Sequence, residues 1–400
     1  MPELKILLGG LPLGCDNIGN EAILGCFVGT LRRLAPGASV TVCTAERKDT
    51  AALLGVETAP LYGFKREHPL SAFGRFVRNF DWYIWCGGTG LSAYPAIAAG
   101  LLETARKQKV PTIAWGIGTD SAPDPVFSGL SGRERALFRA AELLTLGRIP
   151  LAARREECLR IRAQQRVAAE LKHCRLVMVR DAETAEVLRE WGFESAVTGA
   201  DPAILQRTGR VPPVKPELVR IGFCVSARCR GQAVFWNRLA ECDGVELVPI
   251  PMDPEAGYEE MRRLVAGMTR PERVRLTEIE RPAEAQALAA SCDAVVSSRL
   301  HLLIFAVNVG TPVVGIEQGG KVRNFLATLG LTPAGAVGEC DFDAVGEAIN
   351  GYLADSGEAF RATAERVRGE MLARLEAAGQ LLEQTLRRPE RGDTTGFGRS

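Results

Sequence analysis

An arginine and a histidine stand together where a strand is expected to give way to a helix. The apolar run Ala294–Ser297 predicts a buried strand, and Leu300–Asn308 has the apolar spacing of a helix. Arg299 and His301 therefore fall at the first turn of that helix, where unpaired N–H groups and the helix dipole attract anions. A guanidinium binds phosphate or carboxylate in bidentate fashion, and an imidazole exchanges a proton near neutral pH. The spacing predicts an anion site with its own proton donor.

The histidine content of the chain supports the same interpretation. The chain has three histidines, and two of them, His68 and His173, lie in polar, unpatterned surroundings. A single histidine is more often structural than catalytic. Because His301 stands beside Arg299 at a strand-to-helix exit, we favour the catalytic alternative for it.

Glycine-rich segments follow three other predicted strands, Lys5–Gly10, Trp82–Cys86 and Thr112–Trp115. Glycine allows a ligand to approach the backbone closely. Each of these loops could equally turn the chain and cap a helix, so each loop by itself leaves both roles open. The candidate ligand-binding residues within them are Asn17, Gly19, Asn20, Glu21, Gly87, Gly88, Thr89 and Gly118.

Charged residues mark three further strand exits. Arg180 either points toward a ligand or pairs locally with Asp181 or Glu183, and Asp181 is expected to cap the following helix. Asp201 is either another cap or a polar group at a ligand site. Lys321 lies near a helix N-terminus, where a cation is unfavourable unless an anion binds there too.

Short apolar runs alternate with amphipathic stretches along the chain, which predicts an α/β fold with parallel sheets. Helices are expected near 20–34, 131–172, 232–241, 282–291, 300–308, 321–329 and 342–386. The strand candidates are Lys5–Gly10, Val40–Cys43, Trp82–Cys86, Thr112–Trp115, Leu176–Val179, Ala196–Thr198, Val219–Val225, Val245–Ile250, Arg273–Leu276, Ala294–Ser297 and Pro312–Ile316.

A chain of 400 residues exceeds what one hydrophobic core usually supports, so two domains are expected. The segment 207–218 carries three prolines and little periodicity, and it predicts a linker. We therefore expect an N-terminal domain over 1–206 that contributes Arg180, and a C-terminal domain over 219–386 that carries Arg299 and His301. Residues 387–400 are expected to form a flexible tail. Two parallel-sheet domains imply a cleft with ligands at the carboxyl ends of strands.

Composition excludes several classes of function. Lys+Arg 49 against Asp+Glu 48 argues against a nucleic-acid-binding domain. The N-terminus lacks the features of a signal peptide, and no window is apolar enough to span a membrane. The eleven cysteines form no CxxC pair, so we expect buried free thiols and no metal site.

Seven motifs then occur in an order that resembles the polysaccharide pyruvyl transferase family. The resemblance runs from about residue 5 to residue 331, and SSRLHLLIFA is its most specific part. The motifs are NIGNEAIL, CGGTGL, WGIGT, VRDAETAEVL, TGADPAI, SSRLHLLIFA and PVVGIEQGGKVRNFLATLGL.

The resemblance implies two Rossmann-like domains with parallel sheets facing across a cleft, similar to GT-B glycosyltransferases. It implies transfer of a pyruvyl group from phosphoenolpyruvate to sugar hydroxyls of a cell-surface polysaccharide or its lipid-linked precursor, forming a ketal and releasing phosphate. Arg180, Arg299 and His301 would contact that donor, and Leu300 would line the same spot through its backbone. No cofactor is expected beyond phosphoenolpyruvate as co-substrate. The protein would work in the cytoplasm, where peripheral association with the inner face of the membrane would bring it to the precursor.

Three segments depart from the family pattern, and one of them is CGGTGLSAYP, where the family has a plainer triple-glycine run. Asn20 stands where the family usually has aspartate, which leaves Glu21 or Asp16 as acidic substitutes, and the segment EQGGKV differs from the usual tyrosine-aspartate-proline-lysine. Two alternatives remain open: a GT-B-type glycosyltransferase with a nucleotide-sugar donor, and a non-catalytic relative that binds an anion or a glycan.

Overall fold

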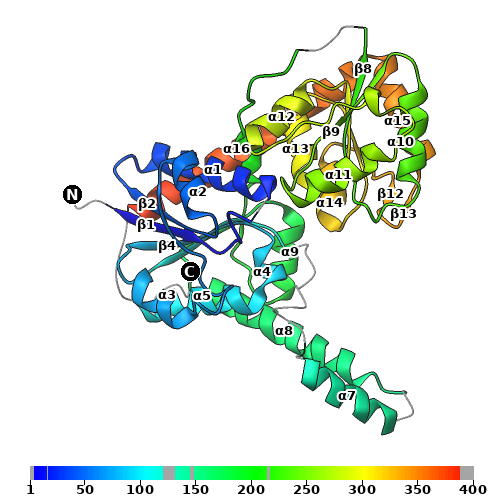
Figure 1. Ribbon diagram of the computed structural model, residues 1–400. Helices are drawn as coiled ribbons and strands as arrows, with labels where there is room; N and C mark the ends of the chain where they lie inside the picture. The colour runs from blue at the N-terminus through cyan, green and yellow to red at the C-terminus, as the bar shows by residue number, and fades with distance from the viewer. Residues whose placement is uncertain are drawn as a thin grey trace. The chain divides into compact units, whose positions relative to one another are not determined.

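The computed structural model describes residues 4–15, 17–119, 130, 132–144, 148–213 and 217–387 (Figure 1). This part of the chain folds into two compact units. The first contains the residues up to Cys15, then Phe27–Asp201 and the helix from Glu376 onward. The second unit contains residues 17–26 and Pro202–Leu375.

The first unit is built on a seven-stranded parallel sheet of order β3-β2-β1-β4-β5-β6-β7. The central strand β4 is buried at every position, as expected for a parallel strand with helices on both faces. The strands are β1 (Lys5–Gly9), β2 (Ser39–Thr44), β3 (Glu57–Pro60), β4 (Trp82–Gly88), β5 (Thr112–Ile117), β6 (Leu176–Val179) and β7 (Val197–Thr198). The helices are α1 (Ile18–Leu34), which begins in the second unit, α2 (Arg47–Leu54), α3 (Leu70–Val77), α4 (Gly90–Ala93), α5 (Pro95–Lys107), α7 (Gly132–Leu144), α8 (Leu151–Leu171) and α9 (Ala182–Glu190).

The second unit has a four-stranded parallel sheet of order β11-β10-β8-β9, with the short antiparallel pair β12-β13 beside it. The strands are β8 (Val219–Cys224), β9 (Val245–Pro249), β10 (Ala294–Ser297), β11 (Val313–Gly315), β12 (Gly335–Ala336) and β13 (Glu339–Cys340). The helices are α10 (Gln232–Glu241), α11 (Ala256–Ala266), α12 (Pro282–Ala290), α13 (Leu300–Asn308), α14 (Gly320–Thr328), α15 (Phe342–Ala354) and α16 (Glu358–Leu386), which ends in the first unit, with 3-10 turns η1 (Pro202–Leu205) and η2 (Pro271–Arg273).

Most expected strands and helices are confirmed, but one expected strand is absent from the described residues and one observed strand was not expected. Arg273–Leu276 is not a strand: η2 covers its first residue, and only Val274 forms a bridge, to Leu247. Glu57–Pro60 was not expected to be a strand, because a charge and a proline mask its apolar content, yet it forms the edge strand β3. The helical region expected near 131–172 is confirmed and contains the two helices α7 and α8.

The limits of the two units differ from the expected domain limits. Residues after Asp201 already bond to α12, since the Gly209 N–H donates to the Ala283 carbonyl oxygen (3.0 Å) and the Gln286 amide donates to the Gln206 carbonyl oxygen (3.0 Å). The second unit therefore starts before the proline-rich segment 207–218. Of the expected tail 387–400, residues 388–400 lie outside the described part of the chain.

None of the eleven cysteines forms a disulfide. The expectation that all of them are buried is wrong. Cys15, Cys158 and Cys242 are exposed to solvent. No helix of the described residues combines the length and the apolar character that crossing a bilayer requires.

Candidate active site

Two buried serines shape the turn from β10 to α13. The Ser297 hydroxyl accepts from the Arg299 N–H (2.9 Å) and lies 3.0 Å from the Arg299 carbonyl oxygen. The Ser298 hydroxyl accepts from the Ser226 N–H (3.0 Å) and donates to Gln318 Oε1 (3.2 Å). Because these partners follow β8 and β11, Ser298 connects the carboxyl ends of three adjacent strands. The turn that holds Arg299 is thus fixed from both sides.

Arg299 is the N-cap residue of α13, and its side chain makes no capping bond to the helix. The first turn of α13 therefore keeps N–H groups that a bound anion could accept from. The Arg299 guanidinium pairs with Asp253 at 2.6 Å while its side chain remains 39% exposed. A partly exposed guanidinium beside an uncapped helix start has the chemistry that binding a phosphate or a carboxylate requires.

Asp253 is a site residue that sequence reasoning missed. It follows the predicted strand Val245–Ile250, so the rule that places functional residues after strands could have found it. Its carboxylate fixes one side of the Arg299 guanidinium.

His301 packs against the first turn of α1, in the same unit. A Cβ atom at Gly19 would lie only 2.0 Å from His301 Nδ1, so the imidazole rests directly on the glycine backbone. The Ile18 N–H donates to the Met252 carbonyl oxygen (3.1 Å), and Asn17 Oδ1 accepts from the Asn20 N–H (3.0 Å) as an N-cap residue does. His301 Nε2 is shielded from solvent. The first turn of α1 thus packs against the imidazole of His301 through Gly19.

The same contacts correct the predicted start of α1. The helix was expected from Asn20, but it begins at Ile18, so that Gly19, Asn20 and Glu21 lie in its first turn and not in a loop. Asn17 provides the cap, and the buried Ile18 anchors the turn. Asp16, the other expected acidic substitute, lies outside the described residues.

A thiol next to this site is held in its protonated form. Burial raises the pKa of Cys224 to about 11, and the Arg299 guanidinium acts in the opposite direction without overcoming burial. Cys224 is therefore no nucleophile at neutral pH. The remaining expected residues of this unit are the buried Leu300, at the first position of α13, and the half-buried Lys321, at the second position of α14.

A second cluster lies in the first unit, around Arg180. The guanidinium rests on the backbone of Gly118, where a Cβ atom would lie 2.6 Å from Arg180 Cζ. It pairs with Asp181 at 3.0 Å and with Asp201 at 3.7 Å. Of the two alternatives left open for Arg180, the structure shows the local pairing with Asp181, and the expected cap is confirmed, since Asp181 accepts from the Thr184 N–H at 2.7 Å. Asp201 takes part in the same ion-pair group.

The glycine exits of β4 and β5 adjoin this cluster. The Gly118 N–H donates to the Gly88 carbonyl oxygen at 2.8 Å, so the two exits lie side by side. Gly87 and Gly88 both have positive φ, and Thr89 is the N-cap residue of the short helix α4. The expected site residues thus fall into two groups: Gly88, Gly118, Arg180 and Asp201 in the first unit, and Asn17, Gly19, Arg299 and His301 in the second.

A comparison with protein families finds a match that covers most of the chain. The family model described as polysaccharide pyruvyl transferase matches residues 17–319, a range that contains both groups. No curated protein sequence matches the chain significantly.

Solved structures resemble the whole chain in fold. The Anabaena protein HepE in complex with UDP and glucose has a TM-score of 0.56 at 13% identity, over 96% of this chain and 100% of that one. A calicheamicin glycosyltransferase gives 0.57 at 15% identity, over 97% and 99%. UDP-GlcNAc 2-epimerase from Neisseria meningitidis, bound to UDP-GlcNAc, gives 0.55 at 11%, over 96% and 99%. Identities this low show the fold alone, and the expected GT-B-like α/β class with two Rossmann-like domains is confirmed.

Proposed function

This chain belongs to the polysaccharide pyruvyl transferase family, and we propose that it transfers the pyruvyl group of phosphoenolpyruvate to sugar hydroxyls of a cell-surface polysaccharide or its lipid-linked precursor. The observation that carries this proposal is the turn Arg299–His301, in which a guanidinium, an uncapped helix start and an imidazole gather within one unit. Phosphoenolpyruvate carries a carboxylate and a phosphate, the two groups that such a site binds best.

The proposed mechanism gives each of these groups one task. Arg299 and the N–H groups of α13 hold an acidic group of the donor, with Leu300 contributing through its backbone. His301 gives a proton to the methylene carbon of the donor, and a sugar hydroxyl forms a C–O bond to the resulting oxocarbenium-like carbon while its own proton passes to the neutral imidazole. The C–O bond to phosphate breaks as a second hydroxyl closes the ketal, the proton of that hydroxyl leaves with the phosphate, and cationic groups stabilise the departing phosphate. We assign Arg180 to the same donor on the family resemblance.

Phosphate release tests this function directly. The protein is incubated with phosphoenolpyruvate and a panel of sugar and lipid-linked acceptors, and inorganic phosphate is measured. His301→Ala should lower the rate by about 10²–10⁴-fold, the usual contribution of a general acid. His173→Ala, an exposed site on the other unit, is the matched control and should leave the rate unchanged. Absence of phosphate release with every acceptor, or an equal rate in His301→Ala, would count against the proposal.

A nucleotide-sugar glycosyltransferase is the second candidate. It is favoured by the fold shared with HepE, whose solved complex contains UDP and glucose. A thermal-shift panel separates the two functions: stabilisation by a UDP-, GDP- or CMP-linked sugar and not by phosphoenolpyruvate would support the glycosyltransferase. Binding of phosphoenolpyruvate without turnover under any condition would instead support a non-catalytic relative.

We further propose peripheral association with an anionic membrane surface on the cytoplasmic side, as a lipid-linked acceptor requires. Helices α7 and α8 carry eight arginines against five glutamates, and α7 exposes Leu137 (71%) and Leu143 (75%) to solvent. Basic helices with exposed apolar residues bind anionic lipid surfaces. Leu137→Ser with Leu143→Ser should reduce co-sedimentation with phosphatidylglycerol vesicles, whereas Leu205→Ser, also an exposed leucine, should not. Equal sedimentation of all variants would contradict the assignment.

A further inference from the structure

The second unit contains a pocket that the donor site does not use. It has a volume of about 730 Å³, within the range of about 300–1,000 Å³ that small-molecule sites occupy. Its lining comes from the segment after β8, from the start of α10 and from α11. Val225, Met261 and Leu264 supply apolar surface, and Val225 and Met261 are buried.

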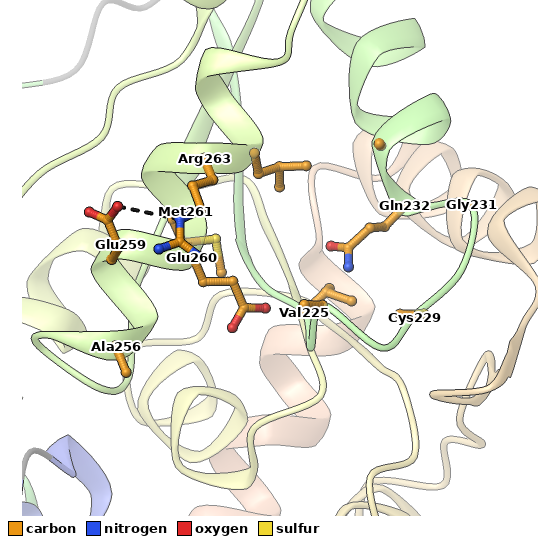
Figure 2. A pocket seen from close by; sticks show the side chains of 12 residues that line it. Val225, Cys229, Gly231, Gln232, Ala256, Glu259, Glu260, Met261 and Arg263 are labelled. Carbon is orange, nitrogen blue, oxygen red and sulfur yellow. Dashed lines mark ion pairs between the residues drawn. The ribbon is translucent and has the colours of Figure 1, made fainter.

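Polar groups converge over this apolar surface from two helices. Figure 2 shows the Glu260 carboxylate, on α11, and the Gln232 amide, on α10, both directed into the pocket. The Gln232 amide nitrogen donates to the Ser226 carbonyl oxygen (2.7 Å), which fixes the orientation of that side chain. The Glu260 carboxylate forms no ion pair and no side-chain hydrogen bond with the residues that the structure describes. An apolar surface with a few convergent polar groups is typical of a ligand site.

The charges select the class of ligand. Glu259, also in the lining, pairs with Arg262 at 2.8 Å and with Arg263 at 3.4 Å, so among the lining residues the Glu260 charge is left over. An anion such as phosphoenolpyruvate is repelled there. A carboxylate accepts only, so it favours a ligand that carries several hydrogen-bond donors. A sugar ring meets both conditions, because its hydroxyls donate to Glu260 while its C–H face covers the apolar surface.

The pocket adjoins the donor site within the same unit. Val225 is followed by Ser226, whose N–H donates to Ser298 Oγ at the turn that holds Arg299. On the other side, α11 begins shortly after Asp253, the ion-pair partner of Arg299. The two segments that line the pocket are therefore adjacent in sequence to Ser226 and Asp253, which contact the turn and the guanidinium of Arg299.

We propose that this pocket binds a sugar unit of the acceptor glycan, with Glu260 accepting from its hydroxyls. This inference rests on the proposed function, since it gives the acceptor a place beside the donor. It predicts that a neutral glycoside binds the protein without phosphoenolpyruvate, and that loss of the Glu260 charge weakens that binding specifically.

Binding of the methyl glycosides of glucose, galactose, mannose and N-acetylglucosamine is measured by saturation-transfer NMR and calorimetry. Glu260→Gln keeps the shape of the side chain but removes the charge, and should weaken the best glycoside about tenfold. Ala256→Trp narrows the pocket from the exposed start of α11 and should abolish binding. Glu255→Gln, which removes one charge just before the same helix but outside the lining, should leave binding unchanged. Phosphoenolpyruvate affinity should stay within twofold in all three variants.

The outcomes separate this inference from the proposed function. If phosphate is released with an acceptor but no glycoside binds, or if Glu260→Gln and Ala256→Trp bind like the unchanged protein, the pocket is not the acceptor site. If glycosides bind in a Glu260-dependent manner but no acceptor releases phosphate, the sugar site stands and pyruvyl transfer is refuted.

Discussion

Substitution of Gly19 by alanine tests whether the first turn of α1 positions His301. The added methyl group would lie 2.0 Å from Nδ1, 2.4 Å from Cγ and 2.7 Å from Cε1 of the imidazole. Ordinary contact with a Cβ atom begins at 3.4 Å, so the ring or the helix turn must move by about 1.4 Å. Hydrogen bonds around Gly19 resist movement of the turn, because Asn17 caps it and the Ile18 N–H donates to the Met252 carbonyl oxygen.

A displacement of that size should be costly for catalysis and modest for folding. Misplacement of a catalytic group by about 1 Å lowers a rate by about 10²-fold, which corresponds to about 2.7 kcal/mol in activation free energy. Overpacking a well-filled site costs about 1–3 kcal/mol of folding stability. Gly19→Ala should therefore remain folded at 25 °C and lose at least 99% of phosphate release.

Gly29→Ala is the matched control on the same helix. Gly29 is exposed, and a Cβ atom there meets nothing within 4 Å. Alanine in a helix interior is more favourable than glycine by about 0.5–1 kcal/mol, so this variant should be fully active and slightly more stable.

Two measurements read out the result. Phosphate release from phosphoenolpyruvate measures the rate, and the imidazole resonances in a ¹H–¹⁵N spectrum measure the position of the ring independently of any activity. The chain has three histidines, so His301 is assigned by its loss in His301→Ala. If Gly19→Ala leaves both the His301 resonances and the rate equal to those of Gly29→Ala, the contact does not position the imidazole and the reasoning is refuted.

Three further predictions concern other parts of the molecule. Gly118→Ala should displace the Arg180 guanidinium, because its Cβ atom would lie 2.6 Å from Cζ, and should weaken phosphoenolpyruvate binding in calorimetry without a comparable loss of stability; unchanged binding would remove Arg180 from the donor site. Glu170→Gln should lower the free energy of unfolding, measured in urea, by about 1–3 kcal/mol, because the Glu170 side chain is 9% exposed and accepts two hydrogen bonds from Arg106. The 34% exposure of Arg106 reduces the loss, and an unchanged free energy of unfolding would show that the ion pair contributes nothing to stability. Burial raises the pKa of Cys292 to about 12, so this thiol stays protonated at pH 8 and should resist iodoacetamide while the three exposed thiols react, as mass spectrometry of the peptides would show; rapid labelling of Cys292 in the folded protein would contradict its burial.

Much of the fold was predictable because the relevant signals are local. Apolar runs of strand length and helical spacing placed β6, β10, α10 and α13 at their observed bounds. The cap at Asp181 and the positive-φ Gly330 after α14 also follow from residue type and neighbours alone. The strand β3 was missed because its charge and its proline obscure the strand pattern. Arg273–Leu276 was wrongly expected to be a strand because its alternating charged and apolar residues imitate that pattern.

The sequence by itself determined that Arg299 and His301 stand at the start of a helix after a buried strand, since residues a few positions apart decide that geometry. Only the tertiary structure decided what meets them. The packing of Gly19 on the imidazole and the pairing of Asp253 with Arg299 join segments far apart in the chain. No local pattern encodes such contacts, because they depend on how sheet order and helix packing bring distant strand exits together. For the same reason, the pocket between α10 and α11 became visible only once the chain was folded.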